Sequence, residues 1–224
     1  LRETNGQAEC NLFKAMNLDY IYVDKGNDIA SLIEAFEKVK DTTKAVVVHI
    51  NTLKGKGYAP AEQNKEKWHW HAPFDIATGE SLSKGGEPDF SDASLEYLLK
   101  KMDDDKSVVA ITAGTPTVMG FTADMRAKAG KQFVDVGIAE ETAVALASGI
   151  AANGGKPVFG VYSSFIQRAY DQITQDVCIN GSPVTFTVFA GSVYGMNDVT
   201  HLGLQDIPML NSIPGLIYLE VRDV

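Results

Sequence analysis

Residues 134–149, VDVGIAEETAVALASG, contain the pattern that decides the fold. A short apolar run ends at Asp135, a glycine turn follows, and the rest reads as a helix with almost no polar face. A helix that is apolar nearly all round is typical of a protein interior. Two acidic residues, Glu140 and Glu141, nevertheless stand at its start, and a carboxylate at the mouth of a buried segment needs either a partner or a function.

The same alternation of apolar strands and helices extends to both sides of this stretch. It predicts an α/β domain with a mostly parallel sheet and helices on both faces. The predicted strands are 107–114, 132–137, 156–164, 183–191 and 215–221, and the predicted helices are about 91–102, the later part of 115–130, the helix that Glu140 begins, and 165–180.

The first 58 residues predict a smaller unit of the same type. A strand at 20–23, an amphipathic helix at 28–42 and a β-branched strand at 44–52 form a βαβ pattern, which favours parallel pairing. From residue 54 to about 89 the pattern dissolves into Gly, Pro, Lys and Glu, so we interpret this stretch as a long connection between domains. Both tryptophans lie in it, so we expect part of it to pack.

Composition excludes several classes of protein. The chain of 224 residues is 45% hydrophobic and has a formal net charge of −9, which argues against nucleic acid or an anionic membrane surface as the main partner. The two cysteines, Cys10 and Cys178, predict no disulfide framework and suit a reducing compartment, so we expect a cytoplasmic protein. Because the last predicted strand has no element after it, we also expect a fragment of a longer protein.

Glu140 is the strongest candidate for chemistry. Ligands of open α/β sheets bind at the carboxyl ends of the strands, where Glu140, Tyr162, Ser163 and the loop 190–203 are all predicted to lie. A glutamate in the first turn of an exposed helix would only complement the helix dipole. Because this helix is predicted to be buried, we favour a functional role for Glu140 and a structural or solvated role for Glu141.

Other sequence patterns are weaker evidence for a functional site. GKGY at 55–58 lacks the ending of a phosphate-binding loop, although Lys54, just before it, and Lys56, within it, are candidates to approach a phosphate. His69 and His71 in WHWH have no further ligands at metal spacing, so we predict no metal site within the chain. Ser163 lacks the G-x-S-x-G context of a hydrolase nucleophile. His201, in a long loop after a strand, is the better histidine candidate.

Three segments taken together resemble a known family. DVGIAEETAV, YSSFIQRAYDQITQDV and VTHLGLQD, in this order, resemble the thiamine-diphosphate enzymes of the transketolase group, most closely its deoxyxylulose-phosphate synthases. The resemblance implies the thiamine-diphosphate-binding fold. It also implies that the carboxyl group of Glu140 hydrogen-bonds a ring nitrogen of the cofactor's aminopyrimidine and promotes the tautomer that takes a proton from the thiazolium carbon.

The resemblance assigns roles to five more residues. It implies that Phe165 stacks on the pyrimidine ring, with Tyr162 and Arg168 nearby. His201 would lie by the reacting carbon, and Lys54 would lie towards the diphosphate.

A domain layout and a reaction follow from the same resemblance. Residues 1–58 would be the C-terminal part of the diphosphate-binding domain, 59–89 an interdomain linker and 90–224 the pyrimidine-binding domain. The ligands for Mg²⁺ are expected outside this chain, and the site would lie between the subunits of a homodimer. The implied reaction transfers a two-carbon unit from pyruvate or a ketose to an aldehyde. A paralogue with a different acceptor and a non-catalytic α/β assembly subunit remain as alternatives.

Several positions depart from the family pattern. Asn27 stands where a histidine is expected, Phe189 replaces an arginine, and Asn197 replaces an aspartate. Glu141 and Thr142 follow Glu140 where the family has Gln-His. An arginine is suited to bind a phosphate and phenylalanine offers no donor, so we hypothesise an acceptor that is less charged or whose phosphate is bound elsewhere.

Overall fold

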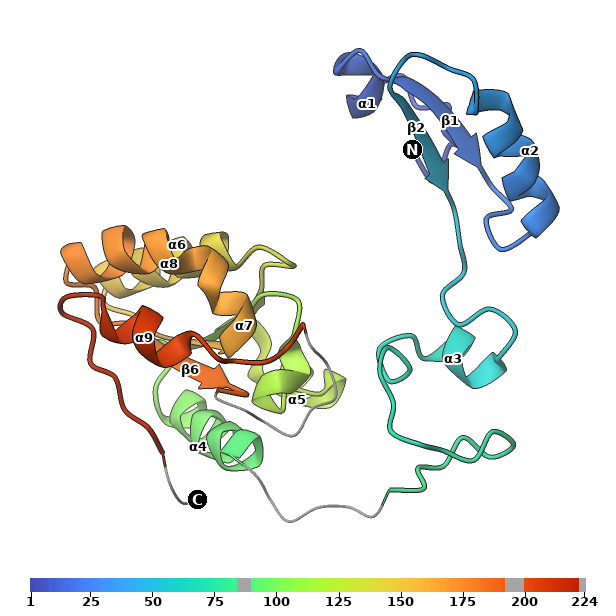
Figure 1. Cartoon of the computed structure of the whole chain (residues 1–224). Helices are drawn as coiled ribbons and strands as arrows, with labels where there is room; N and C mark the ends of the chain where they lie inside the picture. Colours follow the sequence, from blue (N-terminus) through green and yellow to red (C-terminus); the bar gives the residue numbers. More distant parts are fainter. Residues whose placement is uncertain (84–89, 192–199, 222–224) are drawn as a thin grey trace. The chain divides into compact units, whose positions relative to one another are not determined.

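Residues 1–83, 90–191 and 200–221 are described by the computed structural model of this chain (Figure 1). The chain divides into two units, Leu1–Gly85 and Gly86–Val224. Each unit is described below by itself.

The first unit is built on two parallel strands and one helix between them. Its elements are α1 (Leu12–Ala15), β1 (Asp19–Val23), α2 (Ile29–Val39), β2 (Val46–Ile50) and α3 (Ala59–Gln63). β1 and β2 pair in parallel with Tyr22 opposite His49, which confirms the predicted βαβ unit. Asp28 caps α2, because its carboxylate accepts a hydrogen bond from the Ser31 amide.

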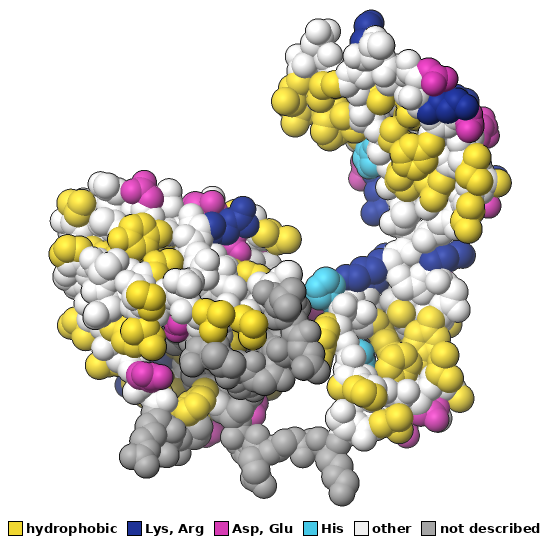
Figure 2. Space-filling view, viewed as in Figure 1, with side chains coloured by type: hydrophobic (Ala, Val, Ile, Leu, Met, Phe, Trp, Pro, Cys, Tyr) yellow, Lys and Arg dark blue, Asp and Glu magenta, His cyan; other side chains and the backbone are white. Residues whose placement is uncertain are grey.

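The surface of α2 is partly apolar. Ile29, Ile33 and Phe36 are 74%, 58% and 50% exposed, and their spacing places them along one face of the helix. Hydrophobic side chains are visible over α2 in Figure 2.

The stretch after β2 is better packed than its composition suggests. Tyr58, Trp68, His71 and Phe74 form an aromatic cluster, with ring centroids 4.7–5.9 Å apart in the contacting pairs. Trp70, in contrast, is 77% exposed. One of the two tryptophans therefore packs as expected, while the role of this stretch as a connection between domains stays a prediction.

The second unit contains a four-stranded sheet in the order β4-β3-β5-β6, with every pair parallel. Its elements, in chain order, are α4 (Phe90–Asp104), β3 (Val108–Thr112), η1 (Pro116–Met119), α5 (Ala123–Ala129), η2 (Gly130–Gln132), β4 (Phe133–Asp135), α6 (Glu140–Ala152), β5 (Lys156–Tyr162), α7 (Ser163–Ile166), η3 (Gln167–Ala169), α8 (Tyr170–Gln172), η4 (Ile173–Ile179), β6 (Thr185–Phe189) and α9 (Asp206–Asn211).

Alternate strand residues point to opposite sides of this sheet, and on each side they pack against helices. Ile111, Phe159 and Val161 are buried with apolar residues of α6, η4 and α9. Val108 and Ala110 are buried with residues of α4, η1 and α5. The predicted fold class, a mostly parallel sheet with helices on both faces, is confirmed.

Two sequence predictions need correction. Residues 215–221 form no strand: Leu216 and Tyr218 pack against the core, whereas Ile217 and Leu219 are 83% and 82% exposed. The alternation of a strand is present, but no neighbouring strand among the described residues pairs with it. The helix predicted at 165–180 is divided into α7, η3, α8 and the π-helical η4. Within the described ranges, no helix has the length and apolarity needed to span a membrane.

Candidate functional site

The turn before α6 is fixed by one aspartate. Asp135, the last residue of β4, accepts hydrogen bonds at Oδ1 from the backbone amides of Gly114 at 2.8 Å and Gly137 at 2.9 Å. Both glycines have positive φ, 77° and 73°, a conformation that glycine adopts without strain. Asp135 thus joins the loops that follow β3 and β4 at the carboxyl end of the sheet, and Glu140 begins its helix at the end of this turn.

Glu140 is a buried carboxylate, and Arg168 is its cationic partner among the described residues. The residue is 2% exposed, and its Oε2 accepts a hydrogen bond from Arg168 Nη1 at 3.2 Å. Arg168 Nε also lies 3.5 Å from Glu141 Oε1, and the side chains of Arg168 and Glu141 are 51% and 41% exposed. Burial of a carboxylate is costly without an opposite charge, and the contact with Arg168 offsets part of that cost. The predicted burial of Glu140 is confirmed, and Glu141 is indeed partly solvated.

Three aromatic rings form a second group. Tyr162 ends β5, Phe165 lies in α7, and His201 lies in the loop before α9. The centroid of the Phe165 ring is 5.4 Å from that of Tyr162 and 5.1 Å from that of His201. The Tyr162 and His201 rings are 6.1 Å apart and perpendicular. His201 Nδ1 shares a hydrogen bond of 2.6 Å with Thr200 Oγ1.

Close backbone packing holds the loop that carries His201. Gly203 pairs with Gly191, just after β6, through an isolated parallel bridge. A Cβ atom on Gly203 would lie 2.3 Å from Ser163 Oγ and 2.5 Å from the Ala190 carbonyl oxygen, so only glycine fits here. The Ser163 hydroxyl is fully buried and has no hydrogen-bond partner among the described residues. Ser163 therefore packs against this loop and is not exposed as a nucleophile.

The second unit therefore brings most of the predicted residues together. Arg168 follows Phe165 by three residues, and residues at this spacing are neighbours on a helical surface. The pair Glu140–Arg168 and the group of Tyr162, Phe165 and His201 thus belong to segments that follow the carboxyl ends of β4, β5 and β6 in the same sheet.

Lys54 belongs to the first unit and has a partner that sequence reasoning missed. Its Nζ is in direct contact with Nδ1 of His69. His71, which the WHWH pattern placed beside His69, instead stacks on Trp68 and hydrogen-bonds the Ala72 carbonyl. The chain bends at residues 69 and 70, between the two histidine positions. A polar pair between a lysine and a histidine 15 residues apart has no periodic signal in the sequence.

The departures from the family pattern have different structural settings. Phe189, at the end of β6, packs against the buried cluster of α4, η1 and α5. Asn27 accepts a hydrogen bond from the Leu53 amide at 2.6 Å. Asn197 lies outside the described residues. Within the described ranges, no three His, Cys, Asp or Glu residues gather closely enough to bind a metal ion.

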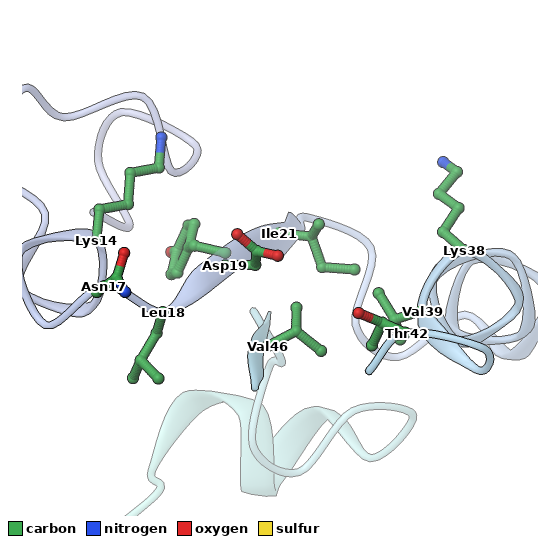
Figure 3. A pocket seen from close by; sticks show the side chains of 10 residues that line it. Lys14, Asn17, Leu18, Asp19, Ile21, Lys38, Val39, Thr42 and Val46 are labelled. Atoms are coloured by element: carbon green, nitrogen blue, oxygen red, sulfur yellow. The ribbon is translucent and has the colours of Figure 1, made fainter. Parts of the chain in front are cut away.

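A hollow of about 540 Å³ lies in the first unit. Leu18, Ile21, Val39 and Val46 contribute apolar side chains to it, with Lys14 and Lys38 among its lining residues. In Figure 3 the ammonium groups of these two lysines lie far apart. Its cations therefore do not converge on one ligand position, and the buried Glu140 carboxylate with Arg168 is the better candidate site.

Comparison with known proteins identifies relatives that match nearly the whole chain. Residues 86–223 match the family model described as transketolase, pyrimidine binding domain. The chain is 43% identical over 213 residues to 1-deoxy-D-xylulose-5-phosphate synthase 2 of Geobacter sulfurreducens, covering 95% of this chain and 34% of that protein. It is 42% identical to synthase 1 of Geobacter metallireducens, with the same coverage. The chain thus spans about a third of the length of these curated relatives.

A solved structure supports the fold alone. The crystal structure of transketolase from Campylobacter jejuni matches 93% of this chain and 43% of its own, with a TM-score of 0.50 and 14% identity.

Proposed function

The chain belongs to the transketolase family through the pyrimidine-binding domain that residues 86–223 match, and on that premise we propose that the whole protein is a thiamine-diphosphate-dependent transferase. Its reaction is the synthesis of 1-deoxy-D-xylulose 5-phosphate from pyruvate and glyceraldehyde 3-phosphate, because the relatives carry that product in their name. The single observation that carries the proposal is the buried Glu140 carboxylate, which accepts a hydrogen bond from Arg168.

These residues fit the pyrimidine half of the cofactor. A carboxylate has about four acceptor positions, and the described hydrogen bond from Arg168 uses one of them. Phe165 offers an aromatic surface of the kind on which a flat heteroaromatic ring stacks. A site that combines a buried acceptor with aromatic rings suits a ring that carries polar nitrogens.

Each residue then has a chemical role. Bound thiamine diphosphate supplies a thiazolium carbon that, once deprotonated, attacks carbonyl groups. Glu140 holds a proton at a ring nitrogen of the pyrimidine, in a setting where burial strengthens the hydrogen bond. Phe165 and Tyr162 orient the ring and exclude water, and His201 exchanges protons with the substrate oxygen at the reacting carbon.

Lys54, in the first unit, is proposed to bind the diphosphate of the cofactor. Lys54 is a cation, and His69, which contacts it through Nδ1, has a second donor at Nε2 in the tautomer whose Nδ1 accepts from the lysine. Both fit an anionic group. Mg²⁺ ligands are expected outside this chain, in the N-terminal part of the diphosphate-binding domain to which residues 1–58 belong under this proposal.

We also propose that the protein is cytoplasmic and forms a homodimer. A second subunit would supply the groups that the site needs beyond those of this chain. The apolar face of α2, with Ile29, Ile33 and Phe36 exposed, supports the idea that residues 1–58 pack against more protein.

The acceptor is proposed to be held differently from that of related synthases. Phe189 packs into the core and offers no hydrogen-bond donor. The test compares kcat/KM of the complete protein for glyceraldehyde 3-phosphate and for unphosphorylated aldehydes, with pyruvate as donor. A strong preference for the phosphorylated acceptor that Phe189→Ala leaves unchanged would contradict this part and leave the ordinary synthase reaction in place.

A non-catalytic assembly subunit is the second candidate. It would keep the fold without binding the cofactor. Calorimetric titration of the complete protein with thiamine diphosphate and Mg²⁺ distinguishes the two, because absence of binding favours the subunit.

A further inference from the structure

Arg168 is shared between two carboxylates in unlike environments. Its Nη1 donates to Oε2 of Glu140, whose side chain is 3% exposed, at 3.2 Å. Its Nε lies 3.5 Å from Oε1 of Glu141, whose side chain is 41% exposed. The two acids are adjacent in the first turn of α6, and the two nitrogens belong to one rigid, planar guanidinium. Closer contact with one acid therefore changes contact with the other.

This arrangement creates a conflict for Glu140. The guanidinium of Arg168 and a ligand nitrogen compete where both approach Oε2, although the carboxylate has further acceptor positions. If Arg168 left Glu140 without a new partner, the cation would lose a charge-assisted hydrogen bond. Glu141 supplies that partner at the cost of a small shift, since Nε already lies at ion-pair distance from it.

We propose that Glu141 is a positioning residue, which takes over the guanidinium of Arg168 when Glu140 turns to the pyrimidine of the cofactor. The inference rests on the proposed function, because it assigns Glu140 to that ring. It explains why this chain has a glutamate where the resemblance leads one to expect a glutamine: an ionised acceptor binds a guanidinium more strongly than a neutral amide does. Glu141 itself touches neither cofactor nor substrate under this proposal.

The test is a double-mutant cycle on the complete protein, read out as the Kd for thiamine diphosphate with Mg²⁺ by calorimetry. Glu141→Gln, which preserves shape, is expected to weaken binding about fivefold, the upper scale of a partly exposed ion pair. In an Arg168→Gln background the same change is expected to alter Kd less than about twofold, because no guanidinium remains to be held. Glu96→Gln, an equal charge change at an exposed position of α4, is the matched control.

Two results would overturn the inference. One is a Glu141→Gln protein that binds as tightly as the Glu96→Gln control. The other is a Glu141→Gln effect of full size in the Arg168→Gln background, which would show that the two residues act independently.

A structural measurement keeps the inference testable even if Arg168→Gln fails to fold. In a crystal structure of the complete protein with cofactor, Arg168 is expected to contact Glu141 and to have left Oε2 of Glu140. A guanidinium still on Glu140 would contradict the exchange. Glu140→Gln separates this inference from the function on which it rests. If Glu140→Gln binds and turns over normally, the proposed function fails; if it is inactive while Glu141→Gln matches the control, only the exchange fails.

Discussion

The guanidinium of Arg168, half exposed to solvent, donates a 3.2 Å hydrogen bond to the almost completely buried carboxylate of Glu140. Removal of Arg168 leaves that carboxylate buried and without its cation. We expect Arg168→Met to lower the free energy of unfolding by about 1–3 kcal/mol, measured by urea denaturation. The double variant with Glu140→Gln should recover much of the loss, since no charge then remains unpaired. An equal loss in the double variant would show that Arg168 stabilises the unit through other contacts.

Two glycines differ in the space around them, and alanine substitutions at the two positions should change stability in opposite directions. A Cβ on Gly160, in β5, would lie 2.0 Å from Cγ of Met119, which is fully buried. Gly160→Ala is therefore expected to destabilise the protein by about 1–3 kcal/mol. Gly149 lies on the exposed side of α6 with no atom near its missing Cβ, so Gly149→Ala should stabilise by about 0.5–1 kcal/mol. Thermal denaturation measures both, and a stable Gly160→Ala protein would contradict the tight contact.

Acid should remove one surface contribution to stability. Lys156 and Ser107 donate hydrogen bonds to Asp105, and these hold the pKa of its carboxyl well below its usual range. A depressed pKa in the folded state stabilises the protein above the unfolded value of about 4, and this contribution disappears as the pH falls through the folded pKa.

Asp105→Asn removes this carboxylate. Its melting temperature should lie below that of the wild type at pH 6, and the difference should shrink steadily below about pH 4. A difference independent of pH would show that the ion pair with Lys156 does not contribute.

The turn before α6 should depend on a single carboxylate. Without the side chain of Asp135, the amides of Gly114 and Gly137 lose their acceptor. We expect hydrogen exchange of these two amides to accelerate about tenfold in Asp135→Ala, as the loss of one hydrogen bond to a charged group implies. Asp135→Asn keeps a side-chain carbonyl and should change exchange less. Unaltered protection in Asp135→Ala would place the control of the turn elsewhere.

Local periodicity was sufficient to predict the four paired strands of the second unit and the βαβ unit of the first. The run from 156 to 164 and the buried start of α6 follow directly from apolar spacing, and the parallel pairing follows from the alternation of elements. Residues 215–221 show the limit of this reasoning. Their alternation satisfies the pattern of a strand, but a strand also requires a hydrogen-bonding neighbour, which periodicity does not specify.

The site was predictable where one segment carries the signal. Glu140 stood out because a charge was placed in an apolar helix, and its burial agrees with that reasoning. The contact of Lys54 with His69 was not predictable, because it depends on a turn between the two residues. The sharing of Arg168 by Glu140 and Glu141 likewise depends on packing between α6 and η3, which lie far apart in the sequence. The catalytic roles of these residues stay predictions.

The most direct test of the account is the turnover of the complete protein in which Glu140 is replaced by alanine. With pyruvate, glyceraldehyde 3-phosphate, thiamine diphosphate and Mg²⁺ at saturation, and with folding verified by circular dichroism, kcat should fall by about 10²-fold or more, the scale of a positioned acid–base group. Glu141→Ala should leave kcat within a few-fold of the wild type. Near-normal turnover in a folded Glu140→Ala protein, or an equal loss from Glu141→Ala alone, would contradict the assignment of Glu140 as the acid that activates the cofactor.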